Sequence, residues 1–353
     1  VIIQKLSGIE ELACVDILCL DKTGTITDGT MKVVETIEID KRYDMDKIVS
    51  NMLVDETNVT DRALLNYYKR RNDMKIIDRL PFSSARKYSK VKFDVAIIDE
   101  ASQATIPSIL IPIAKSRRFI LAGDHKQLPP TIISKKAKEL EKTLFEELIK
   151  LYPSKSQLLN VQYRMNKMLM KFPNKEFYNN GLKSDSSVDE IKIDDLLGSD
   201  NHEDALLFIN TSNAYGNKEN HLKDSKSIIN ELESDIAVKI AKDYLDAGVI
   251  ADDIGIISPY ADQVKIIDNN TPVEVKTVDG FQGREKEIII ISTVRSNDDG
   301  NIGFLKDLRR LNVAITRAKR KLIIIGNKET LKNSPTYARL IDFVENEDLL
   351  IDV

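Results

Sequence analysis

The feature that most limits the fold of this chain is a regular alternation of short apolar runs and amphipathic stretches after residue 92. The apolar runs have the length of buried strands, and the stretches between them place apolar residues at helical spacing. Such alternation predicts parallel strands joined by helices, as in a doubly wound α/β sheet. Strands are predicted at Phe93–Ile98, Phe119–Gly123, Gln157–Val161, Ala205–Ile209, Ile254–Ser258, Val273–Lys276, Glu287–Thr293 and Lys321–Gly326. Helices are predicted at about Ala137–Leu151, Met165–Tyr178, Ser225–Tyr244, Tyr260–Ile267 and Lys306–Lys319.

The composition and charge of the chain exclude several classes of protein. With 353 residues, 42% of them hydrophobic, the chain can form about two domains. No run approaches the roughly 18 apolar residues that a membrane helix needs, so no membrane segment is expected. A net charge of −4 provides no general attraction for nucleic acid, so such a partner would have to be recognised by local patches. Cys14 and Cys19 share one apolar run, which indicates buried thiols in a reducing, cytoplasmic compartment. The oligomeric state is left open.

One predicted strand ends in two adjacent carboxylates. Phe93–Ile98 runs directly into Asp99 and Glu100, which places both side chains at the carboxyl end of a buried strand. In α/β folds, this end of the sheet is where ligands bind. Nucleotide hydrolases use such a pair to hold Mg²⁺ and to orient or deprotonate the attacking water. By itself the pair is more typical of a solvated strand end, so other motifs must decide between the two interpretations.

Two further motifs follow predicted strands. Gly123–Pro130 contains Gln127, whose neutral amide can sense a γ-phosphate or position water. Gln162–Met165 opens a predicted helix, so that Arg164 could face phosphate and Tyr163 could offer its ring to a nucleotide base. Each motif taken singly also fits a plain turn or a structural arginine.

Two motifs near the carboxyl end of the chain carry glycines or arginines. The loop Val278–Glu285 contains Gly283, where backbone can approach a ligand closely, and ends in Glu285, whose carboxylate can accept hydrogen bonds from ribose hydroxyls. Arg317 lies on a predicted amphipathic helix and could reach a γ-phosphate as an arginine finger. A glycine turn and a solvated basic helix face are the alternative interpretations.

Taken together, these strings resemble the motifs of superfamily 1 helicases in their order and approximate spacing. The resemblance is closest to the branch that contains the nonsense-mediated-decay helicase and the immunoglobulin-mu-binding-protein helicase, and it covers Phe93 to about Asn327. It implies two RecA-like domains that bind ATP in the cleft between them and a single strand of RNA or DNA across both. It further implies ATP-driven movement along that strand, with contacts mainly to the nucleic-acid backbone and therefore salt-sensitive binding.

The resemblance also implies a role for each matching residue. The catalytic set consists of Asp99 as Mg²⁺ ligand, Glu100 as catalytic base, Gln127 as γ-phosphate sensor, and Arg164 and Arg317 as phosphate contacts. The remaining nucleotide contacts fall to Tyr163 on the base, Glu285 on the ribose and Gly283 in the adjoining loop.

One motif of that family is absent from the sequence. The first RecA-like domain should begin with a loop of the form Gly-x-x-x-x-Gly-Lys-Ser/Thr, whose amides and lysine hold phosphates. The chain contains no Gly-Lys pair, and residues 1–91 stand where this loop and its first strands should be. We therefore expect residues 92–152 to form a partial first RecA-like domain and residues 153–353 to form a complete second one. ATP hydrolysis stays open.

Residues 1–91 have a signature of their own. Asp21-Lys22-Thr23-Gly24-Thr25 follows the strand-like run Val15–Leu20 and resembles the phosphorylation loop of P-type cation-transporting ATPases, where the aspartate attacks the γ-phosphate of ATP. Pro81–Lys87 is similar to a nucleotide-domain motif of prokaryotic pumps. The resemblance implies an incomplete HAD-like fragment, with Asp21 as candidate phosphorylation site. The later acidic pair and the membrane helices of that family are absent, so a join of two gene fragments is the simplest interpretation.

Three functional hypotheses follow from the sequence. The leading one is an ATP-dependent helicase or translocase of superfamily 1 that uses Mg²⁺ and ATP. The second is a catalytically inactive fusion that retains binding of single-stranded nucleic acid. The third is a phosphoryl acceptor that acts through Asp21.

Overall fold

The computed structural model describes residues 33, 66–68, 93–132, 134–198 and 203–353. The P-type ATPase-like signature, including Asp21, lies outside these residues. The chain divides into two compact units, one that ends at Gly123 and one that spans Asp124–Val353. The domain borders expected at residues 91–92 and 152–153 stay predictions.

The described part of the first unit contains a pair of parallel strands, β1 (Phe93–Ile98) and β2 (Ser116–Leu121). A short 3-10 helix, η1 (Ala101–Gln103), and helix α4 (Ile106–Ala114) connect them. β1 has the predicted bounds, whereas β2 begins three residues earlier than predicted and α4 was not predicted. Two prolines in the α4 sequence hide its helical pattern. The first lies in the opening turn, where a missing N–H costs nothing.

The second unit is built on a six-stranded parallel sheet, which confirms the predicted doubly wound α/β architecture. The strands lie in the order β12-β5-β11-β10-β8-β9. Because every neighbouring pair is parallel, the chain must cross over the sheet between strands, and helices supply these crossovers. The strands are β5 (Leu206–Asn210), β8 (Ile254–Ser258), β9 (Glu274–Thr277), β10 (Lys286–Ser292), β11 (Ala318–Gly326) and β12 (Leu350–Asp352).

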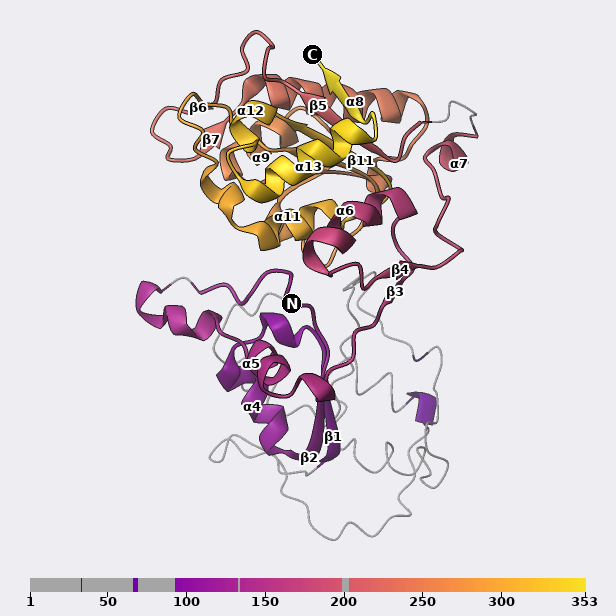
Figure 1. Ribbon diagram of the computed structural model, residues 1–353, viewed down its shortest axis with the longest axis vertical. Coiled ribbons are helices and arrows are strands. Elements are labelled where there is room, and N and C mark those ends of the chain that lie inside the picture. The colour runs from indigo at the N-terminus through magenta and orange to yellow at the C-terminus, as the bar shows by residue number, and fades with distance from the viewer. Residues whose placement is uncertain (1–32, 34–65, 69–92, 133, 199–202) are drawn as a thin grey trace. The chain divides into compact units, whose positions relative to one another are not determined.

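Helices cover both faces of this sheet. Ile289 and Ile291 of β10 face a core that includes α6, α11 and α13, which lie together on one side of the sheet in Figure 1. Ile288 and Ile290 face a second core with α8 and α9. The helices are α6 (Lys167–Phe177), α8 (Glu231–Asp246), α9 (Ala261–Asp268), α10 (Val278–Phe281), α11 (Leu308–Ile315), α12 (Lys328–Leu331) and α13 (Pro335–Asn346). None of the helices in the described ranges is long and apolar enough to cross a membrane.

Shorter elements fill the connections of the second unit. They are η2 (Lys135–Glu141), α5 (Leu144–Leu151), η3 (Pro153–Lys155), β3 (Val161–Gln162), β4 (Lys183–Ser184), α7 (Asp194–Leu197), β6 (Asn220–His221), β7 (Ile228–Ile229), η4 (Ala251–Asp253) and η5 (Gly303–Lys306).

The predicted helix at Lys306–Lys319 was too long at both ends. It begins at Leu308 after the cap residue Asp307, whose side chain accepts a hydrogen bond from Arg309 N, and it ends at Ile315. Thr316 turns its hydroxyl back to the carbonyl of Asn312 at 2.7 Å, which satisfies the last turn. The chain can then enter β11 at Ala318.

Capping residues explain two further corrections. The helix predicted from Ser225 starts only at Glu231, because the side chain of Asn230 accepts the Glu233 amide. The helix predicted at Ala137–Leu151 divides at Thr143, which caps α5 in the same way. The strand predicted at Gln157–Val161 is reduced to the two-residue β3.

Candidate nucleotide site

The carboxylate pair lies where the sequence predicted it, directly after β1. Glu100 N donates to Asp99 Oδ1 at 2.9 Å, and Gln103 Nε2 donates to Glu100 Oε2 at 2.5 Å. Glu100 has a φ of 50°, a left-handed conformation that costs a residue with a side chain on the order of 1 kcal/mol or more. Strain of this kind is common where a side chain must be presented at a functional site.

The carboxyl ends of β1 and β2 are closely joined. Ala101 N donates to Ala122 O, and Ala122 N donates to Ile98 O, both at 2.8 Å. Gly123 follows at a position where a Cβ would lie 2.9 Å from Ser102 N. A residue larger than glycine would therefore push the segment after Glu100 out of place.

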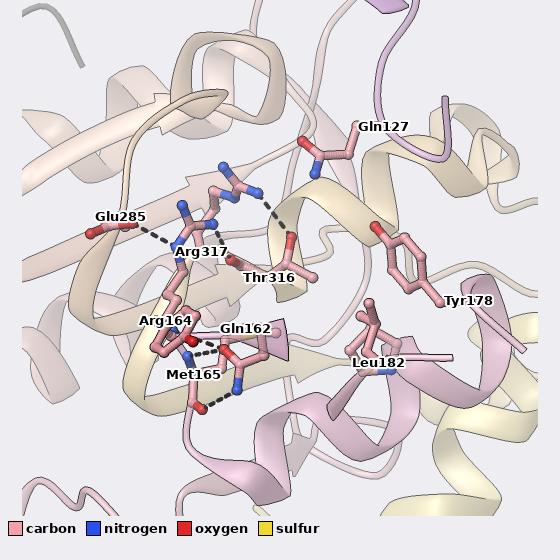
Figure 2. A pocket seen from close by; sticks show the side chains of 11 residues that line it. Gln127, Gln162, Arg164, Met165, Tyr178, Leu182, Glu285, Thr316 and Arg317 are labelled. Atoms are coloured by element: carbon pink, nitrogen blue, oxygen red, sulfur yellow. Dashed lines mark hydrogen bonds and ion pairs between the residues drawn. The ribbon is translucent and has the colours of Figure 1, made fainter. Parts of the chain in front are cut away.

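Five of the predicted site residues come together in the second unit, around one cavity of about 390 Å³. They come from separate segments of the chain, and Figure 2 shows Arg164, Glu285 and Arg317 on one side of the cavity and Gln127 on the other. The lining residues are Gln127, Gln162, Tyr163, Arg164, Met165, Pro173, Tyr178, Leu182, Glu285, Thr316 and Arg317.

The side chain of Gln162 fixes the turn that carries two of these residues. Its Oε1 accepts hydrogen bonds from Arg164 N at 2.9 Å and Met165 N at 2.7 Å, while Nε2 donates to Met165 O and Ser184 Oγ. Tyr163, at the tip of this turn, is 67% exposed, so its ring is accessible. Gln162 was quoted in the motif but given no role, because only its contacts within the fold distinguish it from a solvated amide.

Arg164 is held by an ion pair. Its Nε donates to Glu285 Oε2 at 2.6 Å, and one terminal nitrogen donates to Thr316 O at 3.2 Å. Lys319 Nζ lies 3.4 Å from the other oxygen of Glu285. Burial opposes ionisation of Glu285, but the charges of Arg164 and Lys319 outweigh it and lower the pKa of this carboxyl below its usual value. Glu285 is therefore a fixed anion at neutral pH.

Arg317 is more enclosed than an arginine that reaches out from a helix surface. Its side chain is 1% exposed, and its Nε donates to Val313 O at 2.9 Å. Its terminal nitrogens donate to Arg284 O and to Thr316 Oγ1 at 3.3 and 3.0 Å. The guanidinium thus lines the cavity while it is anchored to the end of α11. Its predicted contact with a γ-phosphate stays a prediction.

The glycine-containing loop is anchored by an aromatic side chain. Phe281 is fully buried over Gly255 of β8, where a Cβ would lie 2.5 Å from a ring carbon. Gly283 follows with a φ of 78°, which lets the chain turn toward Glu285. Among the described residues Gly283 shapes this turn but does not line the cavity.

Known protein families match two stretches of the chain. Two family models, both described as AAA domain, match residues 80–135 and 140–329. The chain belongs to this AAA-domain family. Several of its relatives are named as helicases, in agreement with the helicase motifs of the sequence. The first match begins at residue 80, so the AAA-domain match includes the last residues of the segment that was predicted to resemble a pump.

Three relatives illustrate the breadth of this AAA-domain family. An uncharacterized ATP-dependent helicase of Methanocaldococcus jannaschii, MJ0104, is 48% identical over 72% of this chain and 39% of its own length. DNA polymerase alpha-associated DNA helicase A of Saccharomyces cerevisiae is 36% identical over 84% of this chain and 50% of its own. Regulator of nonsense transcripts 1 of Dictyostelium discoideum is 37% identical over 75% of this chain and 21% of its own. The chain spans half or less of the length of these relatives.

Proposed function

We propose that this chain is the motor part of an ATP-dependent helicase or translocase that moves along single-stranded nucleic acid. The observation that carries this proposal is the convergence of Gln127, Tyr163, Arg164, Glu285 and Arg317 on one cavity. These residue types supply an amide, a ring, two guanidinium groups and a carboxylate, which together match the parts of a nucleoside triphosphate.

Each side chain suits one part of the nucleotide. Arg164 and Arg317 carry the positive charges that phosphates require, and both are already oriented by bonds to the fold. The exposed ring of Tyr163 can stack on the base. Glu285 stays ionised and can accept hydrogen bonds from ribose hydroxyls. Gln127 is the neutral group that would sense the γ-phosphate or position water.

The residues after β1 fit a magnesium ion. Mg²⁺ is commonly held by one or two carboxylates and completes its shell with water and substrate phosphates. Asp99 and Glu100 offer such a pair, and one oxygen of each is already oriented by a hydrogen bond. When bound, the metal would neutralise phosphate charge. Glu100 would accept the proton of the attacking water at Oε1, the oxygen not bonded to Gln103.

We also propose that a single strand of RNA or DNA is the partner that stimulates turnover. The support is the names of the relatives, which include a DNA helicase and a regulator of nonsense transcripts. Residues 92–152 and 153–353 would then be the partial first and complete second RecA-like domains. Because contacts to phosphates release counterions, binding should weaken steeply with salt.

The decisive test is Mg-ATP hydrolysis by the full chain, with and without single-stranded RNA or DNA, alongside Glu100→Gln. We expect nucleic acid to raise turnover and Glu100→Gln to lower it by about a hundredfold or more. Arg164→Ala should weaken binding of a fluorescent ATP analogue. Arg339→Ala, which breaks an ion pair with Glu176 on α6, is the matched control and should leave binding unchanged. Nucleic-acid binding with no hydrolysis under any condition would favour the inactive fusion instead.

A separate proposal concerns the amino-terminal segment. The motif Asp21–Thr25 supports a phosphoryl acceptor, since an aspartate in this setting forms an acyl phosphate in P-type ATPases. Incubation with γ-labelled ATP should then give an acid-stable, hydroxylamine-labile label on Asp21. A label that survives Asp21→Asn would rule this acceptor out.

A further inference from the structure

Tyr178, the residue that follows α6, joins two distant segments through its hydroxyl. The hydroxyl donates to Asp124 Oδ2 at 2.6 Å and accepts from Asn312 Nδ2 at 2.9 Å. Asp124 opens the loop that contains Gln127, and Asn312 lies in α11, five residues before Arg317. The ring of Tyr178 lines the same cavity as Gln127 and Arg317, as Figure 2 shows.

The Asp124 carboxylate organises the loop that follows it. Besides Tyr178, it accepts Gln127 Nε2 at 2.9 Å on Oδ2 and Lys126 N at 2.9 Å on Oδ1. Because a carboxylate only accepts, the nitrogen of the Gln127 amide must face Asp124. The carbonyl oxygen of Gln127 is thereby directed elsewhere. The direction in which Gln127 presents its amide thus depends on where Asp124 is held.

Asn312 ties the same loop to α11. It is fully buried, and its Nδ2 donates to Lys126 O at 3.0 Å as well as to Tyr178. Within the described residues its Oδ1 is buried without a hydrogen-bond partner. Burying an unsatisfied acceptor is unfavourable. Asn312 therefore contributes to the structure through the two hydrogen bonds that its Nδ2 donates.

The hydroxyl of Tyr178 remains a donor over the whole physiological range. Burial, and then the charge of Asp124, raise the pKa of Tyr178 well above its usual value. Asp124 therefore receives the same donor whatever the pH, and the arrangement of the loop does not titrate with Tyr178.

We propose that Tyr178 is a positioning residue for the nucleotide site, whose hydroxyl holds Asp124, and through it the Gln127 amide, against α11. Its kinetic consequence rests on the proposed function, because Gln127 acts there on the γ-phosphate or the attacking water. Its structural consequence, a fixed loop at residues 124–127, does not depend on the proposed function. Loss of the hydroxyl should impair the chemical step more than nucleotide binding.

The test compares Tyr178→Phe with Tyr244→Phe in the full chain. Tyr244 in α8 is a matched control, because it is 9% exposed and its hydroxyl also donates to a carboxylate, Glu203 Oε2, at 2.7 Å. Amide exchange of residues 124–128, followed by mass spectrometry, should be about tenfold faster in Tyr178→Phe and unchanged in Tyr244→Phe. Loop exchange equal to wild type in Tyr178→Phe would overturn the proposal.

Kinetics supply the second readout. In Tyr178→Phe, kcat for nucleic-acid-stimulated ATP hydrolysis should fall about tenfold, while KM changes by less than about twofold. In the Gln127→Ala background, Tyr178→Phe should have no further effect, because the residue through which it acts is gone. Effects that multiply would mean that Tyr178 acts by another route, and would overturn the proposal. If wild-type protein hydrolyses no ATP, the proposed function fails, and loop exchange alone decides whether Tyr178 holds the loop.

Discussion

Arg164 and Arg317 line the same cavity but should contribute differently to the stability of the fold. Arg317 is buried and donates to carbonyls of Val313 and Arg284, whereas Arg164 is partly exposed and pairs with Glu285. We expect Arg317→Ala to lower the free energy of unfolding by about 2–4 kcal/mol, since it removes a large buried side chain together with its hydrogen bonds. Arg164→Ala should cost about 1 kcal/mol. Urea unfolding monitored by circular dichroism measures both, and equal losses would contradict this distinction.

A buried carboxyl gives the second unit a dependence on pH. Glu233 is fully buried and accepts hydrogen bonds from Ser292 Oγ and Val294 N at 2.7 and 2.8 Å. Burial raises the pKa of its carboxyl to about 8, from 4.5 in an exposed chain. Between these values the folded chain holds a proton that the unfolded chain has released. The free energy of unfolding should therefore fall as pH rises, by roughly 1 kcal/mol per pH unit. This dependence should end above about pH 8, where the folded chain has also released the proton.

Glutamine at position 233 should remove this dependence, because its carbonyl oxygen can accept the same two bonds without a charge. Urea unfolding between pH 5.5 and 8.5 should give a flatter stability profile for Glu233→Gln than for wild type. Glu231→Gln, two residues earlier in α8 and exposed, is the control and should keep the wild-type slope. Identical slopes in all three proteins would show that the carboxyl is ionised in the fold.

At this scale the sequence predicted residues with a chemical role but not those that orient them. Gln127, Arg164, Glu285 and Arg317 were identified by motif and lie around one cavity. Tyr178 was not identified as a site residue, because an isolated tyrosine after an amphipathic helix carries no local signal. Its partners lie 54 and 134 residues away and become neighbours only through the fold.

At the scale of elements, β8 and α10 pack closely because Gly255 of β8 has no side chain. Gly255 leaves room for Phe281, so alanine there would force the ring away or open the strand. We expect Gly255→Ala to cost about 1–3 kcal/mol, because overpacking strains a close-packed core. It should also disturb the loop that ends at Glu285. Urea unfolding and nucleotide-analogue binding measure the two effects. A Gly255→Ala protein with wild-type stability would mean that the ring can move without cost.

Element types were easier to predict than element ends. The strand Ile254–Ser258 was predicted with its observed bounds, because an apolar run between polar turns has no other good environment. The start of α8 was missed, since both Ser225 and Asn230 are suitable caps and only the contacts of Asn230 with Gln263 decide between them. β12 was not predicted, because three residues carry too little periodicity.

For the whole molecule, the second unit should fold without the first. Both hydrophobic cores are formed within Asp124–Val353, and so is the cavity. We expect a protein of residues 124–353 to unfold in one cooperative transition, with a Tm within about 5 °C of the corresponding transition in the full chain. Calorimetry measures this. A broad, non-cooperative transition would show that the second unit needs residues before Asp124.

The strand order of the second unit has a consequence for the time at which its site is completed. β5 is the first strand of the large sheet to leave the ribosome, yet its two neighbours are β11 and β12, the last to be made. Thr316 and Arg317 immediately precede β11, so the residues that finish the cavity emerge together with the strand that joins β5 to β10. A nascent chain that stops before Thr316 lacks both β11 and the last residues of the cavity. The order of synthesis thus delays completion of the cavity until the chain has been made as far as β11.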